Sequence, residues 1–420
     1  MKKSLLDKFI WNNLIVFILL NSGGALNYIF QIILGRTLSP DQYGSFNSLL
    51  SMSTLITAPV TILHLVFSRF IARINQDRLQ QIKTLLIKSS RAIFSLISGV
   101  MLIGLLAVPW FKTFLHIETT LPIILMLLAA CFSTVQQVLV AVCEGMHRFL
   151  ALGIISGGGA FMRVFFALFF VIFFGWGVEG SLLAITFASF SAIVYGTWQV
   201  RDVLKSQAGN LPSDFFSEMG RYSIPAFLMI TMVVIMCNID IILVKHYCPP
   251  EQAGYYATAA ILGRIAFFLP SSLLMVLFPS VSKATTSGRK DGHYLWISIG
   301  LTTILSGAVF LVFFLAGKPI IEFIYGDQYF SSAPILKIVT AAMGLLAISQ
   351  VIFSYGLARS EFGFLWPLAG GGILLLLLAF LYHESAETIA WILLLSTTII
   401  FFGTILNRIY LFFSETVTST

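Results

Sequence analysis

The chain of 420 residues is 58% hydrophobic and only 10% charged, with 25 Lys and Arg against 18 Asp and Glu. Soluble domains carry about 25% charged residues, and so few polar side chains cannot cover a water-exposed surface, which excludes a soluble enzyme and a disordered chain. The same composition excludes a disulfide-stapled secreted protein. The four cysteines show no metal-ligand spacing and are interpreted as small core residues.

Long apolar runs predict the secondary structure. A helix needs about 20 apolar residues to cross a bilayer, whereas a membrane β-barrel shows segments of about 10 residues with alternating polarity. The runs here are unbroken, which predicts an all-α polytopic membrane protein with about 12 transmembrane helices. In chain order, the predicted spans are 9–34, 44–67, 90–111, 120–143, 150–174, 178–200, 221–247, 254–280, 294–316, 331–357, 362–382 and 388–412.

The distribution of positive charge predicts the orientation of these spans. With the N-terminus in the cytoplasm, most of the 25 Lys and Arg residues fall at cytoplasmic ends and loops, as the positive-inside rule requires. An even number of spans then places both termini inside (N-in/C-in). The excess positive charge is explained by topology and anionic lipid. Segment 68–89 is predicted as an amphipathic helix on the inner surface, with Ile82 and Leu85 on its apolar face.

A motif recurs half the chain length further on. Residues 40–46, Pro-Asp-Gln-Tyr-Gly-Ser-Phe, follow the first predicted span, and residues 250–256, Pro-Glu-Gln-Ala-Gly-Tyr-Tyr, follow the seventh. Pro59 and Pro270 recur at nearly the same spacing, in the spans that come directly after the two motifs. Self-similarity at a fixed period indicates a structural repeat.

The repeat predicts two homologous six-helix bundles, at 1–205 and 206–420. Since each half contains an even number of spans, both halves have the same orientation and are related by an axis along the membrane normal. This is the plan of a transporter that binds its substrate near the bilayer midplane, between the halves. Pro59 and Pro270 are predicted to kink the repeat-related spans and to act as hinges, with neighbours satisfying the freed carbonyls.

At these motifs the chain resembles the oligosaccharide flippases of the MATE-like (MOP) superfamily, of the O-antigen translocase type. The resemblance is carried by Leu-Gly-Arg-Thr-Leu-x-Pro-x-x-Tyr-Gly at 34–44, Asn-x-Asp at 238–240, Pro-Glu-x-x-Gly-Tyr-Tyr at 250–256 and Leu-Phe-Pro-Ser at 277–280. It implies a MATE-like fold whose spans 1, 2, 7 and 8 line a cleft, and a polyprenyl-diphosphate-linked oligosaccharide as cargo. The first span lacks the ion-coupling aspartate of many drug exporters in the superfamily, which argues against that branch.

A diphosphate head requires cationic groups, and ionisable side chains inside spans are expected to face a cavity rather than lipid. Arg264 lies inside the eighth predicted span and Arg163 inside the fifth. A planar guanidinium suits phosphate oxygens, so both are candidate substrate-binding residues. The alternative for Arg264 is a structural ion pair with Asp240, and the alternative for Arg163 is an ion pair with Glu144 or Glu179.

Asp240 is a carboxylate well inside the seventh predicted span, two residues after Asn238. A carboxylate at this depth can bind H⁺ or Na⁺ and couple an ion gradient to turnover. Asp240 and Asn238 are therefore candidate ion-coupling residues. The alternative makes Asp240 a fixed partner of Arg264.

Further candidates lie in the first two spans. Asn13, Asn27 and Gln31 approximate one face of the first span. Amides inside a span are costly unless hydrated or paired, so these three are candidate sugar contacts, with interhelical hydrogen bonds as the alternative. Arg69 and Arg73, one turn apart at the inner end of the second span, are candidates to receive the diphosphate on entry. Positive-inside anchoring explains the two arginines equally well.

These residues favour a transporter, not an enzyme. The expected function is to flip a lipid-linked oligosaccharide from the cytoplasmic to the periplasmic leaflet of a bacterial inner membrane for surface polysaccharide biosynthesis, by alternating access coupled to H⁺ or Na⁺. A cation-coupled multidrug exporter is the alternative within the superfamily, but two deep arginines against one aspartate favour an anionic cargo. A membrane glycan polymerase or ligase would need catalytic side chains on a sizeable external loop.

No catalytic residue, metal site or cofactor is predicted, because the sequence shows no phosphate-binding glycine loop, no metal-ligand cluster and no hydrolytic triad. The expected partners are the lipid-linked oligosaccharide, H⁺ or Na⁺, membrane lipids and polysaccharide polymerase machinery. No nucleic-acid partner is expected.

Overall fold

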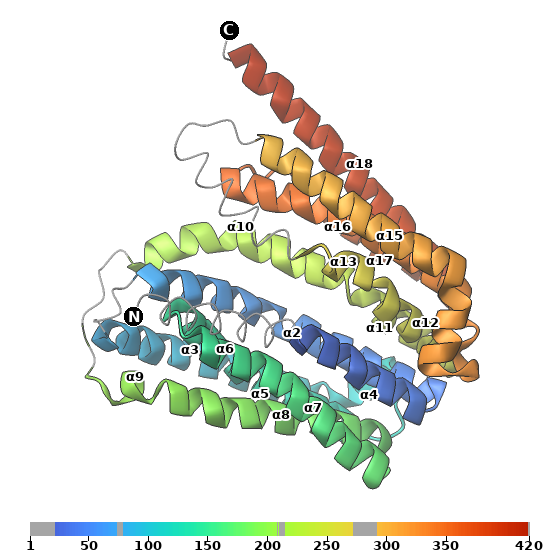
Figure 1. Cartoon of the computed structure of the whole chain (residues 1–420), viewed down its shortest axis with the longest axis horizontal. Helices are drawn as coiled ribbons and strands as arrows, with labels where there is room; N and C mark the ends of the chain where they lie inside the picture. Colours follow the sequence, from blue (N-terminus) through green and yellow to red (C-terminus); the bar gives the residue numbers. More distant parts are fainter. Residues whose placement is uncertain (1–21, 74–78, 208, 210–214, 272–291, 419–420) are drawn as a thin grey trace, which may run out of the picture. The chain divides into compact units, whose positions relative to one another are not determined.

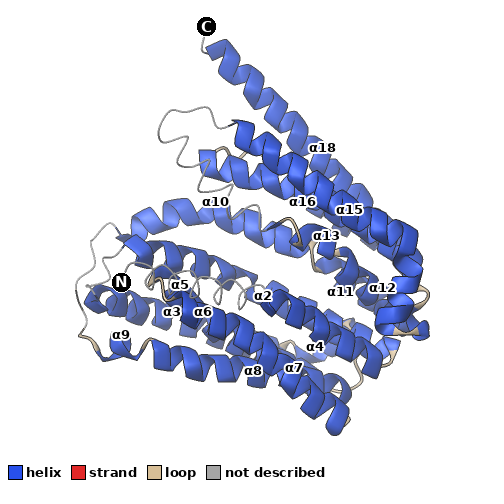
Figure 2. Ribbon diagram, in the orientation of Figure 1, coloured by secondary structure: helices blue, strands red, loops and turns tan. Residues whose placement is uncertain are grey.

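The structure is a computed structural model that describes residues 22–73, 79–207, 209, 215–271 and 292–418. Within these ranges every regular element is a helix (Figure 2), as expected where lipid leaves no water to satisfy backbone groups. The helices cover 22–37, α2 (Pro40–Arg73), α3 (Leu79–Leu106), α4 (Val108–Phe114), α5 (Leu121–Gly145), α6 (Phe149–Gly153), η1 (Ile154–Gly158), α7 (Gly159–Ala167), η2 (Leu168–Phe173), α8 (Gly177–Gln199), α9 (Arg201–Lys205), α10 (Phe215–Met236), α11 (Ile239–Tyr247), α12 (Pro250–Gly263), α13 (Ile265–Phe268), α15 (Gly292–Tyr325), η3 (Asp327–Tyr329), α16 (Ser332–Arg359), α17 (Leu365–Leu381) and α18 (Ala386–Thr418).

The chain is a multi-pass membrane protein, as predicted. Among the described residues, seven helical segments are long and apolar enough to cross a bilayer. They are Leu121–Gly145, Phe149–Phe173, Gly177–Gln199, Ile224–Tyr247, Gly292–Tyr325, Ser332–Arg359 and Ala386–Leu411. Each corresponds to one of the predicted spans. The total of twelve spans and the inside location of both termini remain predictions.

The predicted span at 90–111 is bent rather than continuous. The segments Ile97–Leu106 and Val108–Phe114 meet at an angle of 62°. Pro109 lies in the first turn of α4, where a missing N–H is tolerated at the start of a new helix but not in the interior of an old one. The bend therefore follows from this proline. Counted as one span, the bent pair brings the total to eight.

The described chain divides into two compact units. Unit 1 contains Met1–Leu38 and Met52–Ile224, and unit 2 contains Ser39–Ser51 and Pro225–Thr420. The first turns of α2 therefore belong to unit 2 and the remainder of this helix belongs to unit 1. This division follows contacts, whereas the predicted halves at 1–205 and 206–420 follow the repeat and remain a prediction.

In unit 1, α8 packs along α5 and α7 (Figure 1). The helix at 22–37 approaches the η1 turn at two glycines, since a Cβ on Gly23 would lie 3.6 Å from the Cα of Gly157. Small residues permit such close approach of helices. The glycine-rich turn thus serves packing in this unit.

Segment 79–89 does not form a separate surface helix, so that prediction was wrong. It is the first part of α3, and Ile82 and Leu85 are fully buried in a core with Val142 and Val203. The amphipathic pattern was correct, but protein rather than the membrane surface covers the apolar face. The chain after α9 adds polar contacts, because Gly209 N–H donates to Thr84 Oγ1 at 2.8 Å.

An ion pair between Arg148 and Asp202 joins the start of α9 to the residue that precedes α6. Arg148 donates through both terminal nitrogens to Asp202 and also to the carbonyl of Gln199. The donation from Arg148 lowers the pKa of Asp202. A lowered carboxylate pKa stabilises the fold above the unfolded-state pKa, and this contribution is lost as the pH falls through the folded-state pKa.

We expect Asp202→Asn to lower the melting temperature slightly at pH 7 and to have a smaller effect in acid. The pair is partly exposed, so solvent screening keeps its contribution below about 1 kcal/mol. Thermal unfolding in detergent between pH 3 and pH 7 measures the difference. Glu251→Gln, at an exposed position on α12, controls for loss of one negative charge. A difference independent of pH would contradict the assignment.

Unit 2 is built around α16, which packs against α12, α15 and α18 (Figure 1). It is the most buried of the seven candidate spans. Helix α17 packs on α18. The core of this unit therefore lies along α16.

The two copies of the repeated motif pack directly on each other in unit 2. A Cβ on Gly44 would lie 2.6 Å from the backbone N of Gly254, and a Cβ on Gly254 would lie 2.0 Å from the carbonyl oxygen of Pro40. The recurring glycines are thus required because two backbones cross where α2 and α12 begin. Lys245, whose side chain is 1% exposed, pairs with Asp41 at 2.9 Å beside this crossing.

The N-termini of α2 and α12 are capped differently. In α2, Gln42 N–H donates to Ser39 Oγ at 3.4 Å and Ser39 N–H donates to Gln42 Oε1 at 3.3 Å, which is a capping box. In α12, the preceding residue is a proline without such a cap. There, Gln252 Oε1 instead accepts the N–H of Ala386 at the start of α18, at 3.0 Å. The repeated glutamine thus caps its own helix in one copy and joins two helices in the other.

Candidate functional site

The first candidate cluster lies in unit 2, where two helices are interrupted. The chain turns at Cys237 and Asn238 between α10 and α11, which places Asp240 in the first turn of a new helix. The chain also turns at Arg264 between α12 and α13. Interrupted spans of this kind commonly form substrate and ion sites in transporters. Among the described residues, both candidates therefore lie at or next to helix breaks.

Asp240 and Arg264 form a buried ion pair. Arg264 Nη2 lies 2.9 Å from Asp240 Oδ1, and the Tyr256 hydroxyl donates to Asp240 Oδ2 at 3.1 Å. Asp240 is 0% exposed and Arg264 is 9% exposed. This is the ion pair that the sequence left open as an alternative. The first turn of α11 also favours a negative charge at Asp240, through the helix dipole.

One donor of Arg264 is left over. Its Nε is buried and has no hydrogen-bond partner among the described residues. An unsatisfied buried donor costs about 1–3 kcal/mol, and more when it is charged. The guanidinium therefore retains a binding capacity that the ion pair with Asp240 does not use.

The side chain of Asn238 hydrogen-bonds to α10 rather than to Asp240. Its Nδ2 donates to the carbonyl of Val234 at 2.9 Å and satisfies a group at the end of α10. Tyr256, by contrast, was not predicted as a site residue, although it belongs to the repeated motif at 250–256. Its place in that motif was the available signal.

The second candidate cluster lies in unit 1. Arg163 Nη1 donates to Asn27 Oδ1 at 2.8 Å, and the guanidinium lies 5.9 Å from the centre of the Phe30 ring. Gln31 follows Asn27 by one helical turn. The structure thus brings Arg163 together with Asn27, which the sequence had selected separately. The partner of Arg163 is Asn27, rather than Glu144 or Glu179.

Arg163, like Arg264, has a buried Nε–H without a hydrogen-bond partner among the described residues. Both arginines that the sequence assigned to an anion thus use one terminal nitrogen on a protein acceptor and keep Nε uncompensated.

The remaining predicted residues are placed as follows. Asn13 lies outside the described residues. Arg69 and Arg73 lie in the last turns of α2, and their side chains are outside the described part. Helix α2 continues through Pro59 without a break, whereas Pro270 is buried and follows the end of α13. The hinge assignments remain predictions.

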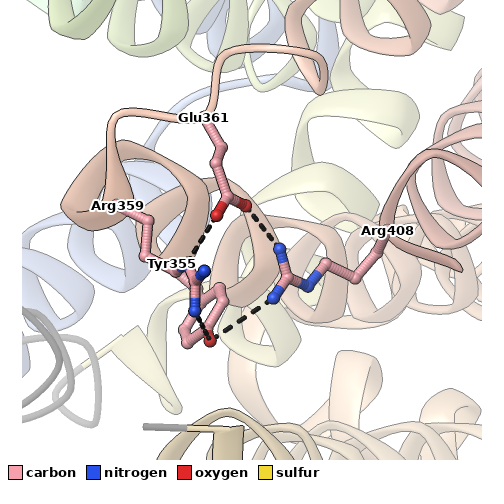
Figure 3. Close-up of polar contacts among 4 residues, drawn as sticks. All are labelled: Tyr355, Arg359, Glu361 and Arg408. Carbon is pink, nitrogen blue, oxygen red and sulfur yellow. Dashed lines mark hydrogen bonds and ion pairs between the residues drawn. The ribbon is translucent and has the colours of Figure 1, made fainter. Parts of the chain in front are cut away.

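A further charged cluster was missed by the sequence reasoning. Arg359 and Arg408 pair with the two carboxylate oxygens of Glu361 (Figure 3). The hydroxyl of Tyr355 accepts from Arg359 Nη1 at 3.3 Å and from Arg408 Nη2 at 3.4 Å. The cluster ties the end of α16 to α18. The two arginines had been used only to assign topology, and the lone Glu361 between them gave no local signal.

Metal and cofactor sites were not predicted, and no group of three or more His, Cys, Asp and Glu side chains suited to a metal occurs in the described ranges. What the two candidate clusters show is electrostatic capacity. Each presents an arginine with a buried Nε–H that has no partner among the described residues, next to polar side chains.

The fold is that of transporters of the MOP superfamily. The structure aligns with an inward-facing multidrug resistance MATE family transporter at a TM-score of 0.79, covering 92% of this chain and 94% of the other, at 11% identity. It aligns with the inward-closed lipid II flippase MurJ at 0.70, covering 94% and 87%, at 12% identity. A MOP superfamily transporter from Pyrococcus furiosus aligns at 0.68, covering 94% of each chain, at 11% identity.

Sequence comparison defines the family. Residues 10–285 match the family described as polysaccharide biosynthesis protein, and the chain belongs to this family. An uncharacterized membrane protein of Methanocaldococcus jannaschii is 25% identical over 207 residues. That match covers 45% of each chain, so the chain spans about half the length of this curated relative.

Proposed function

We propose that the protein flips a polyprenyl-diphosphate-linked oligosaccharide from the cytoplasmic to the periplasmic leaflet of a bacterial inner membrane, for the synthesis of a surface polysaccharide such as O-antigen. Membership of the polysaccharide biosynthesis family and the MOP transporter fold support this proposal. It makes the protein a transporter rather than an enzyme. Polysaccharide polymerase machinery would then receive the flipped lipid.

The main structural support for the proposal comes from two arginine N–H groups that have no hydrogen-bond acceptor among the described residues. Arg163 and Arg264 each keep a buried Nε–H without an acceptor in the described structure. A diphosphate offers several charged oxygens that can accept from a guanidinium in a fixed geometry. A cationic drug would instead be repelled by both groups. The arginines therefore favour the flippase over the multidrug exporter.

Asn27 and Gln31 supply the amide groups that hydroxyl-rich sugars require. Asn27 is exposed, and its Oδ1 orients the guanidinium of Arg163. We assign these amides, with Asn13, to the sugar, and Arg69 and Arg73 to the entering diphosphate.

Asp240, with Asn238, is proposed to couple an ion gradient to the cycle. Each oxygen of Asp240 accepts one hydrogen bond, and a carboxylate oxygen can accept two. A proton or Na⁺ arriving at Asp240 would weaken its attraction for Arg264. The guanidinium would then be available to the diphosphate.

The test uses conservative substitutions that preserve charge. Arg264→Lys keeps a cation beside Asp240 but removes the planar fork and its spare donor, and Arg163→Lys does the same in unit 1. We expect cells depleted of the protein to accumulate one lipid-linked oligosaccharide, measured by mass spectrometry of polyprenyl-diphosphate lipids. Wild type should clear it, and each variant should clear it about tenfold less well, since a charge-assisted hydrogen bond is lost.

Arg201→Lys provides the matched control, because Arg201 is exposed on α9 and stacks on Trp198. It should clear the lipid as well as wild type does. No accumulation on depletion, in a strain without a second flippase, would contradict the lipid-linked cargo and direct attention to drug export.

A further inference from the structure

A small cavity lies beside the buried Pro270 in unit 2. Its volume is about 10 Å³, which is close to the smallest space that holds one water molecule. Three segments line it: the end of α13 with the following turn, the middle of α15, and α16. The lining residues are Phe267, Pro270, Ser271, Thr302, Ala347, Gln350 and Val351.

Two polar atoms of the lining residues are unsatisfied. Thr302 Oγ1 and Gln350 Oε1 are both buried without a hydrogen-bond partner among the described residues, and Thr302 is only 1% exposed. Buried polar atoms in native proteins are nearly always paired, with protein or with ordered water. These two come from different helices, α15 and α16, and border the same water-sized space.

The missing N–H of Pro270 does not explain why Thr302 Oγ1 and Gln350 Oε1 have no partner among the described residues. Proline lacks an N–H, so the carbonyl four residues earlier, at Ala266, loses its helical partner. That carbonyl accepts instead from the hydroxyl of Ser306 at 2.7 Å. Ser306 lies one turn after Thr302 on α15. The freed carbonyl of Ala266 is therefore satisfied by Ser306, and Thr302 is left with a separate requirement.

A second cavity, beside Pro59 in unit 1, provides a contrast. Its volume is about 50 Å³, and its polar lining consists of Thr57 and Thr134, together with the thiol of Cys131. Thr57 donates to the carbonyl of Ser53 at 2.9 Å, and Thr134 donates to that of Ala130 at 2.9 Å. Both hydroxyls are satisfied within their own helices, so this cavity is expected to stay dry although it is larger.

We propose that the cavity at Pro270 is a binding site for a single water molecule. The water donates to Gln350 Oε1, accepts from the Thr302 hydroxyl, and so joins α15 to α16 beside Pro270. Ser271, which also lines the cavity, offers a third polar side chain. A bridge through water is enthalpically nearly as good as a direct hydrogen bond, so it would hold the two helices together.

A double-substitution cycle tests the site without relying on transport. Thr302→Val and Gln350→Met remove the polar atoms at similar volume. If water bridges them, each single substitution strands the other partner, and we expect each to lower the melting temperature in detergent by about 2 °C or more. The double variant should melt no lower than the worse single variant. If both atoms lack a water, each substitution removes an independent penalty, so neutral or raised melting temperatures that add in the double variant would overturn the proposal.

Thr57→Val and Thr134→Val form the matched pair at the unit 1 cavity, and their effects should be additive. A high-resolution experimental structure supplies the second measurement. It should show one ordered water within hydrogen-bonding distance of Thr302 Oγ1 and Gln350 Oε1, and an empty site at that resolution would overturn the proposal. Neither measurement depends on what the protein transports, so failure of this site and failure of the flippase assignment are distinguishable.

Discussion

Asp240→Ala is expected to destabilise the protein by about 3–5 kcal/mol, because it leaves the buried charge of Arg264 uncompensated. Arg264 is 9% exposed and has Asp240 as its ion-pair partner at 2.9 Å. Such a loss would reduce the yield of folded protein and lower its melting temperature in detergent. Static light scattering during a thermal ramp, with matched expression measurements, would detect both effects.

The double variant Asp240→Asn with Arg264→Gln provides the control. Replacing both partners by neutral amides removes the desolvation penalty of the two charges together with their attraction. We expect this double variant to recover most of the stability lost by Asp240→Ala. Wild-type stability of Asp240→Ala itself would show that the pair is not buried as described, and would leave Asp240 free for another role.

Gly254→Ala is also expected to destabilise the protein strongly, but for a different reason. The added Cβ would lie 2.0 Å from the carbonyl oxygen of Pro40, so the backbone of α2 or α12 must move. Overpacking typically costs about 1–3 kcal/mol when side chains can adjust, and here the obstacle is backbone. We therefore expect a loss at or above the upper end of that range, measured as a shift of the thermal unfolding midpoint.

Gly307→Ala is the matched control for this substitution. Gly307 is a helical glycine on α15, and a Cβ added there would have no neighbouring heavy atom within 4 Å. Alanine there should stabilise the helix by about 0.5–1 kcal/mol. Equal effects of the two substitutions would contradict the backbone crossing of α2 and α12.

The apolar pattern was sufficient to predict most of the described helices that are long enough to cross a membrane. Spans such as 120–143 and 331–357 agree with α5 and α16 to within a few residues, because the requirement to bury a continuous apolar length acts locally along the chain. The repeat was also visible locally, through the glycine and proline of each motif. Its structural reason, the crossing of Gly44 and Gly254, needed the three-dimensional structure, since the sequence does not show that the two copies meet.

The candidate sites were predictable only in part. Residue type and depth selected Arg264, Arg163 and Asp240, because an ionisable group inside a span is costly and needs a reason. The partner of each group depends on helices far apart in the sequence, so Asn27 as the partner of Arg163 could not be derived. The breaks before Asp240 and at Arg264 were missed as well, because no proline or glycine marks the first, and the single Gly263 before Arg264 was not interpreted as a break.

The division of α2 between the two contact units has a mechanical consequence. Its first turns are anchored by the glycine crossing and by Lys245, while the helix after Ser51 belongs to unit 1. A helix that is held by other residues at both ends must itself bend when one end is displaced against the other. The part of α2 that follows this boundary contains Pro59, where the helix lacks one of its internal hydrogen bonds. Helix α10 crosses the same division between Ile224 and Pro225, so the chain passes from one unit to the other within two helices, and each of these helices contains a proline.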